Sequence, residues 1–141
     1  MADKVADRLP FLDTNVLLRH LLHDVPGQSE RASTYIAEIE HGSRKVRLAD
    51  TIILEAVLVL QRTYKVPKQE IAKALLSLID LPGMILPRKR LFRAAFAYYA
   101  DLNISFGDAY HAALMESLHI DEVLSFDRDF DRVPGVRRLE P

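Results

Sequence analysis

Hydrophobic positions along the chain follow two alternating patterns: short continuous apolar runs, and longer segments in which apolar residues recur every three or four positions. The short runs predict buried strands, and the longer segments predict amphipathic helices. The predicted strands span residues 9–12, 45–49, 84–86, 122–125 and 136–139. The predicted helices span residues 15–23, 29–40, 67–81, 87–102 and 105–119, with a further helix from 50 or 51 to 64. Strands that alternate with helices indicate βαβ units and an α/β fold with a mainly parallel sheet.

Turn-forming residues separate these elements. Pro26–Gly27, His41–Gly42 and Pro82–Gly83 each end a helical segment. Residues 126–134 have the composition of a turn region. The sequence contains no internal repeat and no low-complexity linker, so we predict a single domain over residues 1–141, of which the polar residues 1–8 are flexible.

Composition narrows the class of protein. The chain has 141 residues, of which 49% are hydrophobic and 28% charged, and this is enough for a full core. The net charge of -1 provides no global basic field, so any nucleic-acid binding must use a local patch. The lack of cysteine excludes disulfides and thiolate chemistry and fits a reducing cytoplasm, where we expect the protein to act. The longest apolar run, residues 52–60, contains a glutamate and is shorter than a membrane span of about 20 residues.

Four acidic residues lie beside core-forming or turn-rich segments. Asp13 and Asp127 come directly after predicted strands, Asp108 lies in the first turn of a helix, and Glu55 lies in the second turn of another. Ligands of parallel sheets gather beyond the carboxyl ends of the strands, so all four could face one crevice. Close carboxylates repel one another, which raises their pKa values or demands a cation. A hard divalent cation such as Mg²⁺ suits such oxygen ligands.

Each carboxylate also has a purely structural interpretation. Asp13 can cap a helix, Glu55 can lie on the exposed edge of its helix, and Asp108 can complete a capping box with Ser105. Asp127 can belong to a solvated turn. His111, one turn after Asp108, is most simply structural.

Three further sets of residues bear on function. Thr14, Asn15 and Ser125 are short polar residues beside the acids and can orient them. Two basic clusters are surface features unless they flank the acidic crevice, where a phosphodiester would need countercharge. Nearby aromatic residues are expected to pack in the core rather than to stack on bases. The clusters are Arg44, Lys45 and Arg47, and Arg88, Lys89, Arg90 and Arg93; the aromatic residues are Phe96, Tyr98 and Tyr99.

With these residues placed, the chain resembles PIN-domain proteins, specifically the VapC-type toxin ribonucleases of type II toxin–antitoxin systems. The matching segments occur in order over nearly the whole chain: FLDTNVLLRHLL, ILEAVLVLQRTY, SFGDAYHAALM and VLSFDRDFDRVPGV. The resemblance implies a three-layer α/β/α sandwich with a central, mainly parallel sheet. It also implies a homodimer and a cognate antitoxin that inhibits the enzyme.

The same resemblance implies a Mg²⁺- or Mn²⁺-dependent endoribonuclease. Its acidic positions fall on Asp13, Glu55, Asp108 and Asp127, and its supporting positions fall on Thr14 or Asn15 and on Ser125. Asp129 could replace Asp127 as the fourth acid. Asp13, Asp108 and Asp127 would hold one or two ions, and Glu55 would either bind metal or act as a base toward water.

Two other functions compete with the nuclease. A phosphatase of the haloacid-dehalogenase type would also use an aspartate after the first strand, but it needs a second Asp where this chain has Asn15. A non-catalytic module with the same fold could bind an antitoxin or RNA. The phosphatase interpretation also lacks a clear lysine motif, and the complete set of four acids favours the nuclease over the non-catalytic module.

Overall fold

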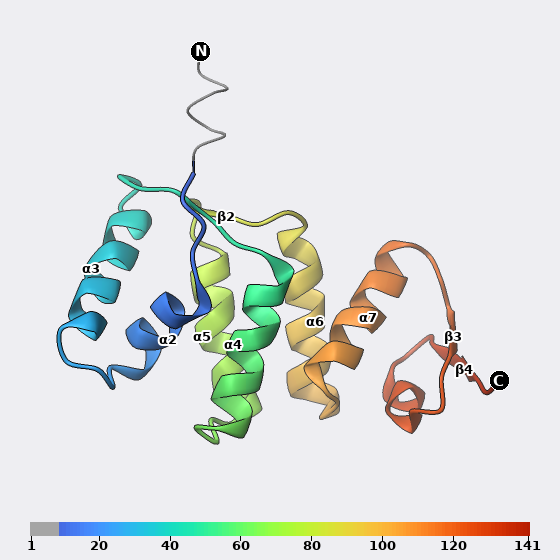
Figure 1. The fold of residues 1–141 in the computed structure, drawn as a ribbon. Helices are drawn as coiled ribbons and strands as arrows, with labels where there is room; N and C mark the ends of the chain where they lie inside the picture. Colours follow the sequence, from blue (N-terminus) through green and yellow to red (C-terminus); the bar gives the residue numbers. More distant parts are fainter. Residues whose placement is uncertain (1–8) are drawn as a thin grey trace, which may run out of the picture.

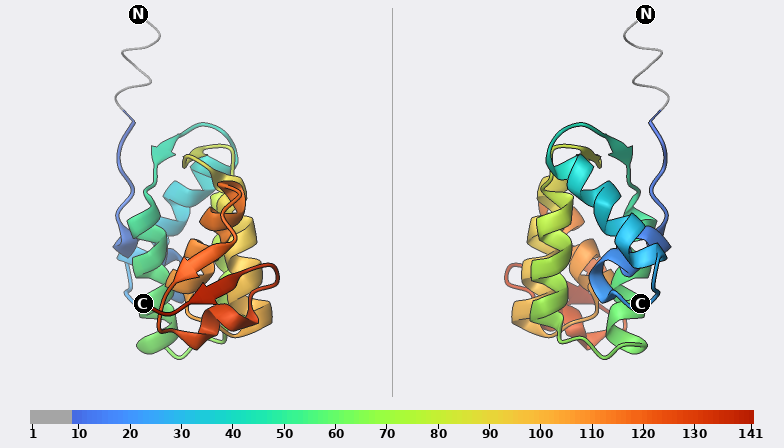
Figure 2. Two further views of the ribbon diagram at one scale, coloured as in Figure 1. Left: turned by 90° about the vertical axis from the view of Figure 1, so that its right-hand side faces the viewer. Right: turned by 90° about the vertical axis from the view of Figure 1, so that its left-hand side faces the viewer.

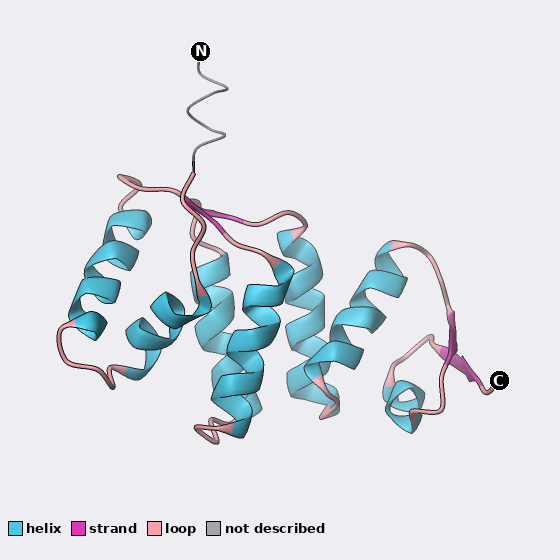
Figure 3. Cartoon of the chain, viewed as in Figure 1, coloured by secondary structure: helices cyan, strands magenta, loops and turns pink. Residues whose placement is uncertain are grey.

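A computed structural model describes residues 9–141, and the predicted alternation of helices and strands is present throughout them (Figures 1 and 3). The helices are α2 (Thr14–Leu22), α3 (Gln28–Glu40), α4 (Asp50–Arg62), α5 (Lys68–Ile79), α6 (Lys89–Leu102) and α7 (Phe106–Ser117). The strands are β1 (Val46–Arg47), β2 (Met84–Ile85), β3 (Glu122–Leu124) and β4 (Arg137–Leu139), and a 3₁₀ helix, η1, covers Arg128–Arg132. The prediction that residues 1–8 are flexible lies outside the described residues.

The strands pair in parallel, as the sequence predicts, but they form two separate pairs. β1 pairs with β2, and β3 pairs with β4. The first predicted strand adds a single bridge, in which Phe11 lies opposite Arg47. In Figure 1, α6 and α7 lie between these two groups of strands, and both views of Figure 2 show helices forming most of the molecule. The described residues are therefore helix-rich α/β with parallel pairing, while the layered sandwich around one central sheet stays a prediction.

Regular helical spacing of apolar residues builds the core. In α4, the buried side chains recur along one face at Ile52, Ile53, Ala56, Val57 and Leu60. Burying the isoleucine, valine and leucine side chains of this set stabilises the fold by roughly 1.5–3 kcal/mol each. These residues belong to the common core, in which α4 contacts α2, α5 and α7.

An aromatic cluster fixes the start of α7 against α6. The ring of Phe106 lies 4.7 Å from that of Phe96 and 5.6 Å from that of Tyr99, measured between centroids. All three residues are buried, so the prediction that Phe96 and Tyr99 pack in the core is confirmed. Tyr98 is only half-buried, and its hydroxyl donates to Glu116. Because Phe106 begins α7, this packing determines where the first turn of that helix lies.

Among residues 9–141 there is no helix with both the length and the apolar character that crossing a membrane requires.

We predict that Gly83→Ala lowers the free energy of unfolding by about 1–3 kcal/mol, the usual cost of overpacking. A Cβ at Gly83 would lie 2.6 Å from the carbonyl oxygen of Arg44 and 2.7 Å from Cγ2 of Ile39. Gly107→Ala is the matched control, because a Cβ there meets nothing within 4 Å. Urea denaturation of both variants measures the difference, and equal stabilities would contradict the prediction.

Candidate metal centre

Asp108 is held in the first turn of α7 by the cap of that helix. The hydroxyl oxygen of Ser105 accepts a hydrogen bond from the backbone N–H of Asp108 at 3.1 Å. Ser105 therefore caps the helix through the backbone N–H of Asp108, as the capping interpretation predicts. This cap does not use Oδ2 of the Asp108 carboxylate. Oδ2 of Asp108 is buried and has no hydrogen-bond partner among residues 9–141. A buried oxygen of this kind is costly unless a proton or a cation satisfies it.

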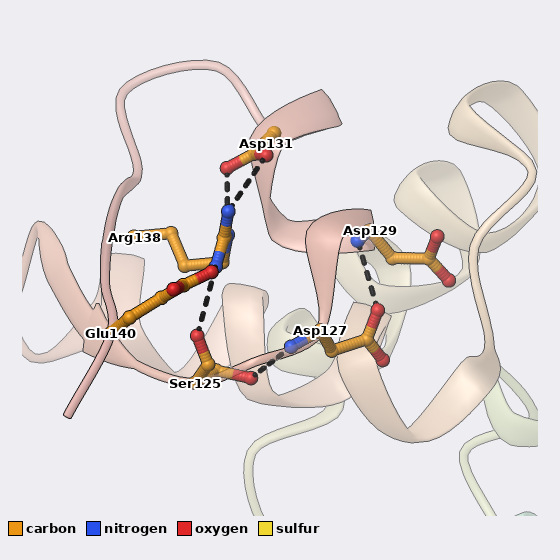
Figure 4. Close-up of polar contacts among 6 residues, drawn as sticks. All are labelled: Ser125, Asp127, Asp129, Asp131, Arg138 and Glu140. Carbon is orange, nitrogen blue, oxygen red and sulfur yellow. Dashed lines mark hydrogen bonds and ion pairs between the residues drawn. The ribbon is translucent and has the colours of Figure 1, made fainter.

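Asp127 and Asp129 lie on the loop that follows β3. The hydroxyl oxygen of Ser125 accepts from the N–H of Asp127 at 2.9 Å, and Oδ1 of Asp127 accepts from the N–H of Asp129 at 2.9 Å. These two bonds start η1 and fix the direction of the loop. Figure 4 shows both carboxylates on the side of the loop away from Arg138. Ser125 thus orients the backbone of Asp127, while its supporting role in a functional site stays a prediction.

Arg138 of β4 ties the same loop together from the other side (Figure 4). Its guanidinium is 3.0 Å from Oδ1 of Asp131 and 2.8 Å from Oε1 of Glu140, and it donates to the carbonyl oxygen of Ser125 at 3.1 Å. The Arg138 side chain is only 12% exposed, although both of its acidic partners are largely in solvent. One arginine therefore fixes the segment that carries Asp127 and Asp129.

The carboxylates of Asp108, Asp127 and Asp129 form a compact group, in which one oxygen from each residue lies within 4.8 Å of the others. The pKa of Asp108 is raised to about 6. Burial is the largest cause of this shift, and the neighbouring carboxylate of Asp127 is the next. The pKa of Asp127 is lowered, first because the N–H of Asp129 donates to it and second because of its contact with Asp108. The protein accordingly holds a proton at Asp108 in preference to Asp127 when no cation is bound.

Lys68 is a cation close to this group. Its ammonium donates to the carbonyl oxygen of Ile104 at 2.7 Å and lies 4.7 Å from the ring centroid of Tyr99. Partial burial lowers the pKa of Lys68, and the charge of Asp129 opposes that shift. Lys68 therefore offsets part of the negative charge of Asp129.

Asp13 and Glu55 lie outside the three-carboxylate group, and a third residue links them. Asp13 caps α2, with its carboxylate accepting from the N–H of Asn15 at 3.4 Å. The next residue, Thr14, is buried and donates its hydroxyl to Oε2 of Glu55 at 2.9 Å. Both carboxylates are exposed, so the interpretation of Glu55 as a residue on the open edge of α4 is correct. Thr14 supports Glu55, whereas Asn15 contributes its backbone N–H to Asp13.

The structure therefore brings together two of the four predicted acids, Asp108 and Asp127. It adds Asp129, which the sequence proposed as a substitute for Asp127 and which lies beside it. A site shared with Asp13 and Glu55 stays a prediction. Sequence reasoning missed Arg138 and Lys68, because both lie in segments with ordinary surface composition and no local pattern marks them.

Comparison with known sequences gives the class of protein. The family model for the PIN domain matches residues 11–136. This range covers most of the chain, and the chain therefore belongs to the PIN domain family.

A more specific similarity is to a VapC ribonuclease from Aquifex aeolicus (strain VF5). The two sequences are 25% identical over an alignment of 136 residues, which covers 94% of this chain and 97% of the relative. The similarity therefore runs through every segment that carries a site residue.

The raised pKa of Asp108 predicts how the stability of the metal-free protein depends on pH. The folded protein keeps the proton up to a pH of about 6, whereas the unfolded chain releases it near pH ~4. Ionised Asp108 thus opposes folding above its folded pKa, and this penalty is relieved as the pH falls from about 6 to about 4. The lowered pKa of Asp127 has the opposite sign and acts below about pH 4.

We expect Asp108→Asn to be more stable than wild type at neutral pH, with the difference shrinking toward about pH 5. Urea denaturation of wild type and Asp108→Asn in EDTA, at neutral pH and at about pH 5, measures this difference in stability. The cap survives in the variant because Ser105 bonds the backbone N–H. A stability difference that does not change with pH would show that Asp108 is not protonated in the folded protein.

Proposed function

We propose that the protein is a metal-dependent endoribonuclease that hydrolyses RNA phosphodiester bonds. The observation that carries the proposal is the group of Asp108, Asp127 and Asp129, in which a buried carboxylate oxygen has no partner. Membership of the PIN domain family and similarity to a VapC ribonuclease support it. A Mg²⁺ or Mn²⁺ ion would fit these residues, because both ions prefer carboxylate oxygens and tolerate a partly hydrated site.

Each residue of the site has a task in this proposal. Asp108 and Asp127 would hold the ion, with Asp129 as a third oxygen donor, and the ion supplies a Lewis acid that activates water and offsets charge on the leaving oxygen. Asp13 would extend the ligand set. Glu55, oriented by Thr14, would accept a proton from water or serve as a ligand.

The protein would act in the cytoplasm as the toxin of a toxin–antitoxin pair. This part of the proposal rests on the resemblance to VapC-type toxins and on the similarity to the Aquifex aeolicus VapC ribonuclease. A cognate antitoxin would inhibit the enzyme, and two copies of the chain would form a homodimer. The three-layer sandwich of the family would be the arrangement of its single domain.

The direct test is to incubate the purified, antitoxin-free protein with total cellular RNA in Mg²⁺, in Mn²⁺ and in EDTA. We predict discrete RNA fragments that require the metal and that disappear in Asp13→Ala and Asp108→Asn, because each variant removes a proposed ligand. Asp101→Asn, an exposed acid on α6, is the matched control and should cleave as wild type does. Cleavage in EDTA, or unchanged cleavage by Asp108→Asn, would refute the proposed mechanism. A folded protein that cleaves nothing would instead favour a non-catalytic binding module.

A second prediction concerns the hydroxyl of Thr14. Thr14→Val keeps the shape of this buried side chain but removes the hydrogen bond that orients Glu55. We expect RNA cleavage to fall by roughly tenfold, a fraction of what a positioned acid–base group supplies. Thr14→Ser retains the hydroxyl and should keep most of the activity. Equal rates for the Val and Ser variants would show that Thr14 does not position Glu55.

A further inference from the structure

A cavity lies between the first two turns of α4 and the first two turns of α7. Its volume is about 210 Å³, below the roughly 300–1,000 Å³ that drug-sized ligands occupy, so it suits one small ring system. Its lining residues are Asp50, Thr51, Leu54, Phe106, Gly107, Tyr110 and His111. Leu54 directly precedes Glu55, and Gly107 directly precedes Asp108. The cavity and the proposed site of cleavage therefore share the same two helical turns.

The walls of the cavity are suited to a flat apolar ring. Leu54 is 36% exposed, which is unusual for a leucine of α4, and it faces the cavity with Tyr110 and His111 from α7. The Tyr110 ring is held from behind by Phe92, with 5.6 Å between centroids. Aromatic and aliphatic walls of this kind stack on nucleobases, because every base presents an apolar π face.

Asp50 is the one acidic residue among those that line the cavity, and it gives the cavity a chemical preference. Oδ2 of Asp50 accepts a hydrogen bond from the hydroxyl of Tyr110 and lies 3.9 Å from the guanidinium of Arg88. Tyr110 contacts only one of the two carboxylate oxygens, and Oδ1 of Asp50 is the other acceptor of this group. An ionised carboxylate only accepts hydrogen bonds, and it can accept several. A ligand that fits must therefore present donors to Asp50.

We propose that this cavity binds a guanine base of the RNA strand. Guanine is the base whose Watson–Crick edge presents two adjacent donors, N1–H and the 2-amino group, and these match one carboxylate. Adenine and cytosine each place a ring-nitrogen acceptor beside their amino group, and uracil has a single donor between two acceptors. Arg88, which belongs to the second basic cluster, lies beside Asp50 and would contact the phosphate of the same nucleotide.

The assignment to RNA rests on the proposed ribonuclease function, whereas the preference for guanine rests only on the cavity. A guanine held between α4 and α7 would position the neighbouring phosphodiester near Glu55 and Asp108. Base recognition at Asp50 would then select the sequence that is cut.

Binding of short RNAs in EDTA tests the proposal without cleavage. The probes are a pentanucleotide with one guanosine among uridines, the same RNA with inosine or adenosine at that position, and free guanosine monophosphate. We expect the guanosine RNA to bind about tenfold more tightly than the adenosine RNA, as a bidentate contact supplies. The inosine RNA, which lacks the 2-amino group, should fall between them. Guanosine monophosphate should bind more weakly than the guanosine RNA, and equal affinity would overturn the assignment to RNA in favour of a free nucleotide.

Two variants identify the residues responsible. Asp50→Asn should remove the preference for guanosine. Leu54→Ala should weaken the binding of all three RNAs but retain the preference for guanosine. Asp101→Asn is the control and should change nothing. Circular dichroism confirms that each variant is folded, and a guanosine preference that persists in folded Asp50→Asn would overturn the proposal. Metal-dependent cleavage without any base preference would refute only the guanine site, while guanine preference without cleavage would refute only the ribonuclease.

Discussion

The mutual repulsion of Asp108, Asp127 and Asp129 is the interaction on which the rest of the site depends. Three carboxylates with oxygens within 4.8 Å of one another oppose folding unless a proton or a cation is present. The protein holds them there mainly by anchoring the backbone, and the one carboxylate it also anchors is that of Asp127, through the N–H of Asp129. Ser105 caps the turn that carries Asp108, and Ser125 fixes the loop that carries the other two. The carboxylate oxygens therefore stay available to a ligand.

The core supplies the rigidity that this arrangement needs. Phe106, buried against Phe96 and Tyr99, fixes the start of α7, and the next turn presents Asp108. On the opposite side, Arg138 joins β4 to the loop after β3 through Asp131 and Ser125. Packing and the guanidinium of Arg138 thus bring segments that are separated in sequence into contact, at a stability cost that a bound divalent cation would offset.

Helices were predictable from the sequence because their signals are local. Apolar spacing and the breakers at Pro26–Gly27 and Pro82–Gly83 located α3 and α5 to within a few residues. The pairing of strands was less predictable, since an apolar run such as residues 9–12 shows that a strand is buried but not which strand lies beside it. Asp108 and Asp127 were predictable for the same local reason, as each follows a cap or a strand. The contact of Thr14 with Glu55 crosses 41 positions of sequence, and no local pattern encodes it.

Titration of the metal-free protein with Mn²⁺, followed by electron paramagnetic resonance, measures whether Asp108, Asp127 and Asp129 form a divalent-metal site. The signal of free Mn²⁺ counts the ions that remain unbound, without any need for RNA or activity. At neutral pH, wild type and Asp101→Asn should each remove at least one ion per chain, and Asp108→Asn should lose most of that affinity. Equal binding by wild type and Asp108→Asn, or no binding by folded wild type, would contradict the presence of this metal site.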